Sequence, residues 1–374
     1  MSRRVVVAMS GGVDSSVAAA LLKERGDDVI GITMRLWTEP RPEGFSGRTL
    51  CCGVEDIDDA RRVAQTLDIP HYTLNLERPF KRFVVDPFVD EYARGRTPNP
   101  CLNCNTFIKF DLFHERALAL KADFIATGHY ARRVEGPQGV ELHRAQHADK
   151  DQSYVLYTLT PQALDRTLFP LGDLRKEEVR EIAQRHHLAV ADKPDSVDIC
   201  FVPGGDYREF VRDRLADRPG AIVDRAGATI AEHDGVQHFT VGQRRGLGVA
   251  LGDKNYVTGI DAGRNRVQIG PQSDLDADQI DVHDVRWLID PPPHSPLPVD
   301  AKVRYRTPPV AATVQALPVA ADGGARATVS FANPVRAAAP GQAVVWYLGQ
   351  RVVGGGTIAA TNALSPQPEP AQAP

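Results

Sequence analysis

A run of serines and glycines, Ser-Gly-Gly-Val-Asp-Ser-Ser at residues 10–16, directly follows the first apolar stretch of the chain. Paired glycines let a backbone approach a ligand closely and adopt positive φ angles, and serine hydroxyls donate hydrogen bonds. The Ala/Leu-rich run at 17–22 predicts a helix, and its N-terminus favours an anion through unpaired N–H groups and the helix dipole. The pattern therefore predicts a phosphate cradle. It has neither the Gly-Lys-Ser/Thr of a Walker A loop nor the spacing of G-x-G-x-x-G.

Five cysteines are the other reactive side chains. Cys101 and Cys104 have the C-x-x-C spacing of a redox pair or of half a zinc site, and the spacing alone does not distinguish these. A structural zinc would need two further ligands, and only Cys200 is an obvious third. Cys104 is expected at a helix start after two prolines, where a thiolate is favoured. For the adjacent Cys51 and Cys52 we expect burial without chemistry.

The elements that must position these groups alternate between apolar runs and helical patterns. This alternation predicts an α/β fold with a doubly wound parallel sheet, whose ligands bind at the carboxyl ends of the strands. The 10–16 loop follows the first strand, Met34 lies near the end of the second, and Gly128-His129-Tyr130 follows the fourth. A polar loop is expected at 37–53. The expected strands are 5–8, 28–36, 71–76 and 123–127, with a strand-like triplet at 199–201, and the expected helices are 54–67, 80–94, 106–120 and 175–187.

From about Pro219 onward, helical spacing gives way to short β-branched runs between glycine turns. A basic glycine loop at 242–248 lies among them, and the prolines at 291–293 predict a stiff linker. Near the C-terminus, Tyr305 lies among arginines, which suits base stacking and phosphate contact, or a charged strand edge. The first expected strands are 221–223, 229–232, 239–240 and a hairpin at 256–269. After the linker, the expected strands 301–305, 311–316, 325–331, 343–347 and 351–358 suggest a small closed barrel.

The 374 residues exceed what one hydrophobic core usually organises, so several domains are expected. A net charge of −4 limits any RNA surface to a local patch. Neither an apolar signal region nor a membrane-spanning run is visible in the sequence, which predicts a cytoplasmic protein. We expect a domain with the phosphate cradle at 1–215, a small β-rich central domain at 216–276, a C-terminal β-barrel at 277–362, and a disordered tail at 363–374.

The first motif resembles the PP-loop of the ATP pyrophosphatases, which cleave ATP between its α- and β-phosphates and leave AMP on a substrate oxygen. Eight segments, taken in order, resemble the bacterial tRNA-specific 2-thiouridylase family, which makes 2-thiouridine at the wobble position of tRNA. They are Ser-Gly-Gly-Val-Asp-Ser-Ser (10–16), Gly-Arg-Thr-Pro-Asn-Pro-Cys-x-x-Cys-Asn (95–105), Ala-Thr-Gly-His-Tyr (126–130), Lys-Asp-Gln-Ser-Tyr (150–154), Asp-Ser-x-x-Ile-Cys-Phe (195–201), Gly-Gln-Arg-Arg-Gly-Leu-Gly (242–248), Tyr-Arg (305–306) and Pro-Gly-Gln (340–342).

The resemblance implies that the domain at 1–215 is an ATP-binding catalytic domain and that the barrel at 277–362 binds tRNA. It also implies a two-step reaction. The uridine O2 attacks the α-phosphate of ATP, and Cys200 then supplies sulfur from a persulfide that a donor protein loads onto it. Cys104 is the partner nucleophile, so a disulfide between Cys104 and Cys200 remains, whether the persulfide attacks C2 directly or is first released as sulfide. The implied ATP-binding residues are Ala8, Met9, Ser10, Gly11, Gly12, Val13, Asp14, Ser15, Met34 and Gly128. The implied tRNA-binding residues are Asn99, Pro100, Cys101, His129, Lys150, Asp151, Gln152, Tyr305, Arg306 and Gln342.

Further expectations concern metals and partners. Mg²⁺ is the expected companion of the ATP phosphates, with Asp14 orienting either the ion or the loop. Some relatives carry aspartate where this chain has Cys101, so Cys101, Cys104 and Cys200 could together bind an iron–sulfur cluster. No other metal site is expected. The expected partners are tRNA and a persulfide-donor protein, the chain is expected to be a monomer, and no membrane is involved.

Two other interpretations stay open at this point. An adenylating ligase with the same loop but another substrate would need no paired cysteines. An RNA-binding module with a degenerate nucleotide site would show no ATP turnover with any tRNA.

Overall fold

The computed structural model describes residues 2–37, 54–195, 199–202, 206–249, 254–319 and 323–364. Most of the loop expected at 37–53, with Cys51 and Cys52, and the tail after 364 lie outside these ranges. The chain forms two compact units, which are described separately below. The first unit comprises residues 1–88, 100–210 and 350–353, and the second comprises 89–99, 211–349 and 354–374.

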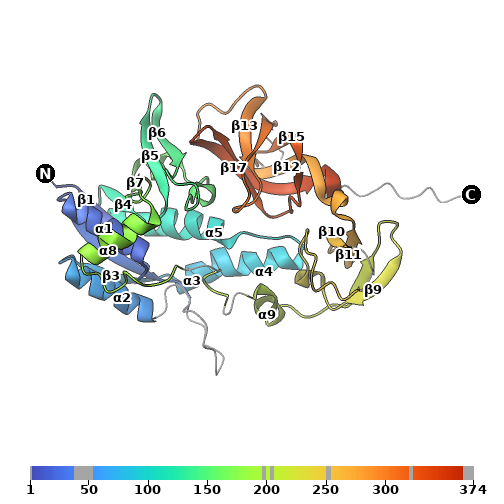
Figure 1. Ribbon diagram of the computed structural model, residues 1–374, viewed down its shortest axis with the longest axis horizontal. Coiled ribbons are helices and arrows are strands. Elements are labelled where there is room, and N and C mark those ends of the chain that lie inside the picture. The colour runs from blue at the N-terminus through green and yellow to red at the C-terminus, as the bar shows by residue number, and fades with distance from the viewer. Residues whose placement is uncertain are drawn as a thin grey trace, which may run out of the picture. The chain divides into compact units, whose positions relative to one another are not determined.

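A parallel sheet of five strands organises the first unit, in the order β3-β2-β1-β4-β7 (Figure 1). Val5 of β1 pairs with Val29 of β2 and with Phe124 of β4, so β1 is flanked on both sides. The printed pairings of this sheet are all parallel. The strands are β1 (Arg4–Ala8), β2 (Asp28–Arg35), β3 (His71–Asn75), β4 (Phe124–Ala126) and β7 (Thr167–Leu168).

The strand order reverses direction at β1. The chain runs outward from β1 to β2 and β3, and then returns to place β4 on the other side of β1. In open parallel sheets, ligands bind at the carboxyl ends of the strands at such a reversal, because the two neighbouring connections diverge to opposite faces. Residues 10–16 follow β1 and residues 128–130 follow β4, so both segments flank this point. The predicted doubly wound sheet is confirmed.

Apolar helix faces cover one side of the sheet. Val5 and Val7 of β1 share a buried cluster with Val17 of α1, Val63 of α2 and Val179 of α8, and α1 contacts α8 directly. Removing these side chains from water is the main force that holds the helices on the sheet. The helices are α1 (Val13–Glu24), α2 (Val54–Thr66), α3 (Glu77–Phe80), η1 (Lys81–Val85), α4 (Asp86–Ala93), α5 (Pro100–Asn103), η2 (Cys104–Leu112), α6 (Phe113–Ala119), η3 (Ser153–Val155), α7 (Pro161–Asp165), α8 (Lys176–Arg185) and α9 (Tyr207–Arg212).

Two helical stretches differ from their predicted form. The helix expected over 80–94 begins at Glu77 and contains the π-helical segment η1. The helix expected over 106–120 begins at Pro100, because proline is well suited to a first helical turn, and continues through the π-helical segment η2. Cys101 and Cys104 therefore lie within this helix and not before it.

A hairpin that the sequence analysis missed, β5 (Ala131–Gly136) and β6 (Gly139–Arg144), follows the β4 loop in the first unit. Its register pairs Ala131 with Arg144. Residues 350–353 belong to the same unit, and Arg351 pairs with His143 of β6.

The second unit contains a four-stranded sheet and a closed barrel. The sheet order is β10-β11-β8-β9, with a core that includes Ile222, Val257 and Val267. In the barrel, β12 pairs with both β15 and β17, which joins the two ends of the order β12-β15-β14-β13-β16-β17. The strands are β8 (Gly220–Val223), β9 (Thr229–His233), β10 (Tyr256–Asp261), β11 (Arg266–Gly270), β12 (Asp276–Trp287), β13 (Leu297–Lys302), β14 (Val310–Ala316), β15 (Ala327–Arg336), β16 (Ala343–Leu348) and β17 (Arg351–Thr361), with the 3-10 turns η5 (Val236–His238), η6 (Gln272–Leu275) and η7 (Asn362–Leu364).

The closed barrel is confirmed, but its strand inventory was incomplete. Strand β12 was not predicted. Its buried residues Ala277, Ile280, Val282 and Val285 are spaced by three, two and three positions, so the strict alternation expected of a strand is broken. The prolines at 291–293 lie between β12 and β13, inside the barrel sequence, so they form a barrel loop and the predicted linker is wrong. Residues 239–240, expected as a strand, form none.

Candidate functional site

The phosphate loop joins β1 to α1. The backbone N–H of Ser10 donates to Oγ of Ser15 (3.0 Å), and Oγ of Ser16 donates to the carbonyl of Gly12 (2.8 Å). Gly12 is the N-cap of α1, and within the described residues no side chain caps that helix end. The first N–H groups of an uncapped helix need an acceptor, and an anion is the acceptor that the helix dipole favours. The geometry therefore suits a phosphate.

Two glycines allow close backbone contacts between this loop and other segments of the chain. Gly11 has φ +73°, and a Cβ there would meet the carbonyl oxygen of Asp56 at 2.2 Å. A Cβ on Gly128 would lie 2.7 Å from the backbone N of Ser15. The segment after β4 thus lies so close to the N-terminal turn of α1 that only glycine, which has no Cβ, fits at position 128.

The remaining residues expected to bind ATP are placed as follows. Ala8, Met9 and Val13 are buried, so they can offer only backbone groups to a ligand. Met34 is buried in β2, two positions beyond Ile32, which pairs with Ala8. Met34 therefore lies at the same edge of the sheet as the loop. A role against the base of ATP stays a prediction.

A network of charged side chains surrounds Asp14. Its Oδ1 accepts hydrogen bonds from the Tyr130 hydroxyl (2.8 Å) and from Nζ of Lys176 (2.6 Å). Lys176 also lies 2.7 Å from Asp195, which pairs with Lys150 at 3.0 Å. Burial and the neighbouring Asp14 carboxylate raise the pKa of Tyr130, so its hydroxyl stays protonated and donates. Burial opposes the charged form of Asp195, but the hydrogen bonds from Lys176 and Lys150 outweigh it and lower the pKa of that carboxyl.

Lys193 clamps the phosphate loop to the start of α2. Its Nζ donates to the carbonyl of Gly11 (2.9 Å), to Asp56 (2.7 Å) and to Asp59 (2.7 Å). Burial alone would lower the pKa of Lys193, but the two carboxylates more than compensate and raise it. These bonds hold Gly11 of the phosphate loop in place.

Replacing Lys193 by methionine is expected to lower the free energy of unfolding by about 2 kcal/mol, because the Asp56 side chain, only 6% exposed, loses its counter-ion. Chemical denaturation measures this loss. Lys81→Met is the matched control, since Lys81 pairs with Asp86 at the surface and should cost less than about 0.5 kcal/mol. Equal stability of the two variants would contradict the clamp.

His129 lies buried next to Gly128, in the loop after β4. Its Nε2 faces Nζ of Lys109 (3.4 Å) and its Nδ1 faces Oγ1 of Thr127 (2.8 Å). An ammonium can only donate, so Nε2 is the acceptor and the proton of the neutral ring belongs on Nδ1. Burial and Lys109 hold the pKa of His129 well below its ordinary value of 6.5.

This depressed pKa has a stability consequence. The unfolded chain protonates His129 first as the pH falls, so its contribution to stability is present above about pH 6.5 and is lost below it, at up to about 1.4 kcal/mol per pH unit. We expect His129→Gln to have a shallower loss of stability between pH 7 and pH 5 than the unmodified chain. Denaturation at several pH values tests this, and ¹⁵N NMR of the ring tests the tautomer. An imidazole that titrates near its ordinary pKa would contradict it.

The three described cysteines all lie in the first unit and carry thiols. Cys101 is exposed on α5, Cys104 is buried at the first residue of η2, and Cys200 is half-buried. Cys200 and its neighbours form a turn, so the strand-like triplet predicted at 199–201 is wrong. The next residue after Cys104, Asn105, donates from Nδ2 to the carbonyl of Val155 (2.7 Å), which ties η2 to the segment after Lys150-Asp151-Gln152.

Aromatic packing anchors both reactive cysteine segments on the helix α3-η1-α4. Phe201, which follows Cys200, is buried with ring centroids 5.6 Å from Phe80 and 5.2 Å from Phe88. On the η2 side, Phe107 stacks on Phe83 of η1 at 5.1 Å. The turn of Cys200 and the π-helix of Cys104 therefore share one supporting helix, in spite of their separation along the chain.

Residues 150–152, expected to contact tRNA, are engaged within the protein. Lys150 pairs with Asp195, as described above. The Asp151 carboxylate accepts from the backbone N–H of Ala145 (3.0 Å) and from Ser153, and Oε1 of Gln152 accepts from the backbone N–H of Tyr130 (2.9 Å). These bonds position the β4 loop and its neighbours. Contact with RNA stays a prediction for all three.

In the second unit, the segment before Asn99 is joined to Gln342. The backbone N–H of Thr97 donates to the carbonyl of Pro340 (2.8 Å), and Nε2 of Gln342 donates back to the carbonyl of Thr97 (2.8 Å). A Cβ on Gly341, which has φ +89°, would lie 3.0 Å from the backbone N of Thr97. Asn99 and Gln342, both predicted to bind tRNA, are thus brought to the same part of this unit.

Tyr305 and Arg306 lie in a turn after β13 and not in the strand expected over 301–305. Tyr305 is exposed, and Nζ of Lys302 lies 5.5 Å from its ring centroid. Arg304 is used internally, since its Nη2 donates to the carbonyls of Ala337 (2.6 Å) and Val241 (3.3 Å). The exposed cation–aromatic group of the barrel is therefore the turn at 302–306.

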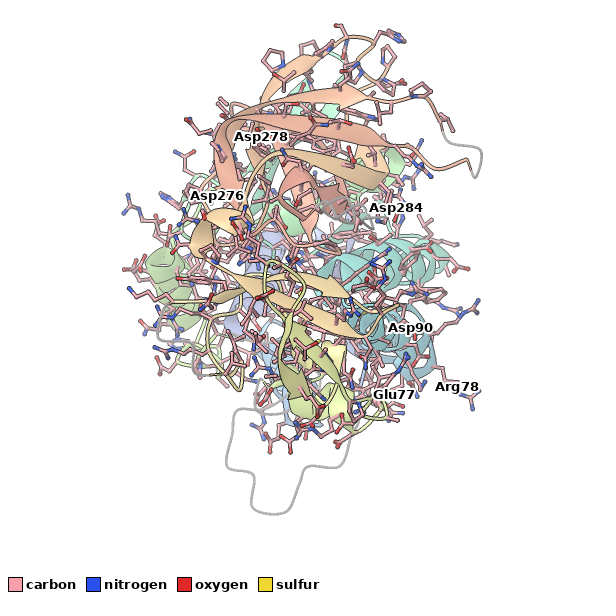
Figure 2. All side chains as sticks on the ribbon, turned by 90° about the vertical axis from the view of Figure 1, so that its right-hand side faces the viewer. Glu77, Arg78, Asp90, Asp276, Asp278 and Asp284 are labelled. Atoms are coloured by element: carbon pink, nitrogen blue, oxygen red, sulfur yellow. The ribbon has the colours of Figure 1, made fainter. Side chains whose placement is uncertain are left out.

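Strand β12 gives the barrel an acidic side. Asp276, Asp278 and Asp284, labelled in Figure 2, lie along it with Asp281, and all but Asp276 are exposed. The guanidinium of Arg336 pairs with Asp276 at 2.9 Å. Carboxylates repel phosphates, so this side of the barrel does not suit an RNA backbone.

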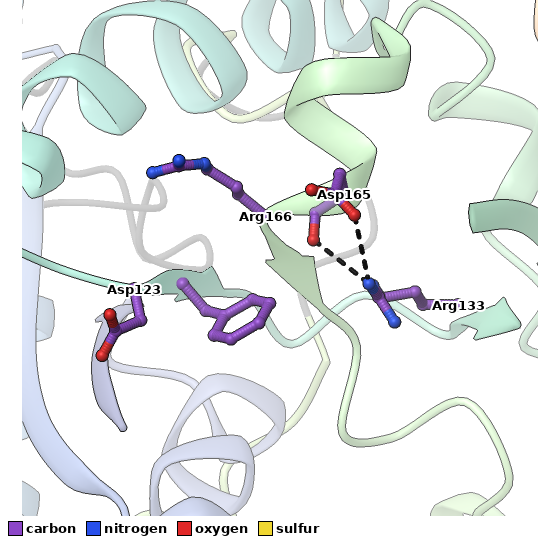
Figure 3. Close-up of a pocket in the computed structure, with 5 residues that line it drawn as sticks. Asp123, Arg133, Asp165 and Arg166 are labelled. Atoms are coloured by element: carbon purple, nitrogen blue, oxygen red, sulfur yellow. Dashed lines mark hydrogen bonds and ion pairs between the residues drawn. The ribbon is translucent and has the colours of Figure 1, made fainter. Parts of the chain in front are cut away.

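One pocket of about 280 Å³ in the first unit lies at the amino end of β4 (Figure 3). Phe124 lines it together with Asp123 and Arg166, and Arg133 pairs across its rim with Asp165. The phosphate loop lies at the carboxyl ends of the strands, so this pocket is a separate feature.

Two further features of the described part of the chain concern metal binding and membrane insertion. Across those residues, no group of three His, Cys, Asp or Glu side chains is arranged to hold a metal ion, so an iron–sulfur cluster at Cys101, Cys104 and Cys200 is not supported. Among the helices of the described ranges, none combines the length and the apolar composition that a membrane crossing requires.

Sequence reasoning missed the residues that support the loop. Four residues contact the loop or its partners, namely Tyr130, Lys176, Lys193 and Asp195. The sequence analysis gave none of them a role in holding the loop. A signal existed in Lys-Pro-Asp-Ser at 193–196, where a cation and an anion flank a proline directly after an amphipathic helix. For Lys176, in the first turn of α8, there was no local signal, because its partner Asp14 lies 162 positions earlier.

Comparison with known proteins agrees with this geometry. A family model described as the tRNA methyl transferase HUP domain matches residues 3–204, the tRNA methyl transferase PRC-barrel domain matches 208–271, and the aminomethyltransferase beta-barrel domain matches 277–358. The tRNA-specific 2-thiouridylase MnmA of Magnetococcus marinus is 50% identical over 359 residues, covering 95% of this chain and 99% of that relative. The corresponding protein of Geobacter metallireducens is 50% identical over 362 residues, covering 95% and 96%. That of Rhodospirillum centenum is 48% identical over 383 residues, covering 99% and 96%. The chain therefore belongs to the MnmA family of tRNA-specific 2-thiouridylases.

Proposed function

We propose that this chain is an ATP-dependent tRNA sulfurtransferase, which converts the wobble uridine of tRNA to 2-thiouridine and releases AMP and pyrophosphate. The observation that carries the proposal is a combination found within one unit. An uncapped helix end, closed by glycine backbone, lies at the reversal point of a parallel sheet, and two cysteine segments pack on one helix of the same unit. The first feature suits ATP, and the second suits thiol exchange.

In the first step, the uridine O2 attacks the α-phosphorus of ATP, the bond to the β-phosphate oxygen breaks, and pyrophosphate leaves. Negative charge grows on the phosphates as this bond breaks. The N–H groups of α1 and the ammonium of Lys176 are the fixed donors that would stabilise this charge, and such preorganised donors are commonly the largest catalytic contribution. Mg²⁺ bound with the phosphates would neutralise part of their charge, and Asp14 is the carboxylate of the loop that could hold it.

In the second step, sulfur replaces the adenylated oxygen. The terminal sulfur of a Cys200 persulfide attacks C2, and the C2–O bond breaks to release AMP. The Cys104 thiolate then attacks the Sγ atom of Cys200, the S–S bond breaks with its electron pair on the transferred sulfur, and a Cys104–Cys200 disulfide forms. Alternatively, Cys104 attacks first and liberates sulfide, which then attacks C2. Both routes consume one persulfide and require a dithiol reductant before the next turnover.

Partners follow from this chemistry. A persulfide-donor protein must load Cys200, which is half-buried. A flipped anticodon base must reach the phosphate loop, which is easier from a loop than from a duplex. We propose that Asn99, Gln342 and the exposed turn at 302–306 contact the tRNA, and that the chain acts as a monomer.

Mass analysis of tRNA nucleosides tests the function directly. Incubation of the chain with unmodified tRNA, ATP, magnesium and a persulfide source should yield 2-thiouridine, with AMP in equal amount. Omission of ATP is the control, since without adenylation the C2 oxygen is a poor leaving group. Pyrophosphate release with another substrate and no thiolated nucleoside would instead indicate a different adenylating ligase.

A further inference from the structure

A carboxylate occupies a site of three cations next to the phosphate loop. Asp195 lies 2.7 Å from Nζ of Lys176, 3.0 Å from Nζ of Lys150 and 3.5 Å from Nη2 of Arg180. Lys176 also bonds Asp14, which belongs to the loop itself. Three cations thus face two carboxylates, and the cluster keeps one positive charge in excess.

Lys176 is the central cation of this cluster. Its side chain is only 8% exposed, so water solvates its ammonium poorly and an anion must be present to compensate its charge. Lys176 and Arg180 lie one turn apart on α8, while Lys150 comes from the segment before η3. Cations that converge from separate elements on one point can bind a compact multivalent anion such as a phosphate, for which a carboxylate is a weaker and smaller substitute.

We propose that Lys150, Lys176 and Arg180 form a subsite for the β- and γ-phosphates of ATP and for the pyrophosphate that leaves, and that Asp195 occupies this subsite until nucleotide displaces it. This inference rests on the proposed function for the identity of its ligand. The site adjoins the N-terminus of α1 through Asp14, so one polyphosphate can contact both the helix end and the three cations.

Displacement of Asp195 by a nucleotide would also affect Cys200, the residue that carries the sulfur. Cys200 follows Asp195 by five positions. On either side of this stretch the chain is held, by the contacts of Lys193 with Gly11 and by the burial of Phe201. In the sequence, Asp195 and Cys200 both lie between these two held residues, so we expect a change at Asp195 to affect Cys200. Asp195 is a positioning residue in this scheme, and a nucleotide in the subsite alters the reactivity of the Cys200 thiol.

Binding of inorganic pyrophosphate, measured by calorimetry, tests the subsite without tRNA or sulfur. Asp195→Asn removes the competing anion, so pyrophosphate should bind about tenfold more tightly, since apparent affinity scales with the fraction of protein whose site is open. Asp195→Glu restores a carboxylate and should return the affinity toward that of the unmodified chain. Lys176→Met should weaken binding at least about tenfold, because it removes the most buried cation of the site.

Asp27→Asn is the matched control. Asp27 also pairs with two cations, Arg3 and Arg25, and its side chain is buried, but it lies away from the loop. This variant should bind pyrophosphate as the unmodified chain does. If Asp195→Asn binds pyrophosphate no better than Asp27→Asn does, or more weakly, Asp195 is a structural strut and the proposal is overturned.

The alkylation rate of Cys200, followed by mass spectrometry, tests the coupling in the unmodified chain. Pyrophosphate should change this rate at least about threefold, and Asp195→Asn should have the changed rate without pyrophosphate. A Cys200 rate that pyrophosphate leaves unchanged would overturn the coupling even if a variant failed to fold. Neither measurement involves thiolation, so a chain that behaves as stated here yet forms no 2-thiouridine would refute the proposed function and leave the subsite standing.

Discussion

Replacing either Cys104 or Cys200 by serine is expected to lower the rate of 2-thiouridine formation at least about 10³-fold. Pyrophosphate release in the presence of tRNA and ATP should continue. A serine hydroxyl can neither carry a persulfide nor attack one, so the sulfur step loses its nucleophile or its resolving group. Adenylation uses the phosphate loop and the uridine oxygen, and both are intact. Separate assays of pyrophosphate and of thiolated nucleoside measure the two steps.

Cys52→Ser is the control for this experiment, because Cys52 takes no part in the scheme, and it should retain full activity. The thiol-exchange scheme fails if either the Cys104 or the Cys200 variant still thiolates tRNA at the rate of this control. Non-reducing mass spectrometry after a single turnover adds a positive readout, since the unmodified chain should then contain a Cys104–Cys200 disulfide.

Replacing Gly128 by alanine is expected to have the second large effect. The rate of ATP-dependent pyrophosphate release should fall at least about 10²-fold. The new Cβ would lie 2.7 Å from the backbone N of Ser15 and 2.8 Å from the carbonyl carbon of Asp14. Both neighbours are backbone atoms at the start of α1, so the helix end or the β4 loop must move. A shift of the donors by even an ångström misaligns them with the phosphates.

Gly263→Ala is its matched control. A Cβ on Gly263 would meet only a side-chain oxygen, at 3.4 Å, in the β10–β11 hairpin of the second unit. Pyrophosphate release and ATP affinity should be unchanged there, and both should fall in the Gly128 variant. Normal ATP affinity in Gly128→Ala would show that the cradle tolerates the displacement, which would contradict the close approach described here.

The sequence was sufficient for features that are local. The phosphate loop, the parallel sheet and the C-x-x-C pair each follow from a few adjacent residues, and β1, β2, α2, β3 and α8 lie within a few residues of their predicted bounds. Prolines did not predict where a helix begins. Pro100 begins a helix although a helix start was placed at Thr106, because proline can either end one element or begin the next.

The parts that the sequence did not reveal depend on distant pairing. Lys176 meets Asp14 only because α8 packs on α1, and Lys193 meets Asp56 only because the chain returns to the phosphate loop. Strand β12 was overlooked because its buried residues do not alternate strictly along the sequence. Tyr305 was placed at the end of the strand expected over 301–305, whereas it lies exposed in the turn after β13.

The domain boundaries and the roles of the individual ATP and tRNA contacts remain predictions. Asn99 and Gln342 were grouped by resemblance, and the structure places the Thr97 backbone and the Gln342 side chain in direct contact, which no local pattern could have revealed. The internal bonds of Lys150, Asp151 and Gln152 show that a motif residue can serve the fold of the site as well as its ligand.

Closure of the barrel has a consequence for biosynthesis. Because β12 pairs with β17, the first strand of the barrel cannot complete its pairing until the last strand of the barrel has been synthesised. Until residues 354–361 have left the exit tunnel, β12 has an unpaired edge that can associate with other nascent chains. The aspartates exposed along β12 would help to keep this unpaired edge soluble until β17 pairs with it.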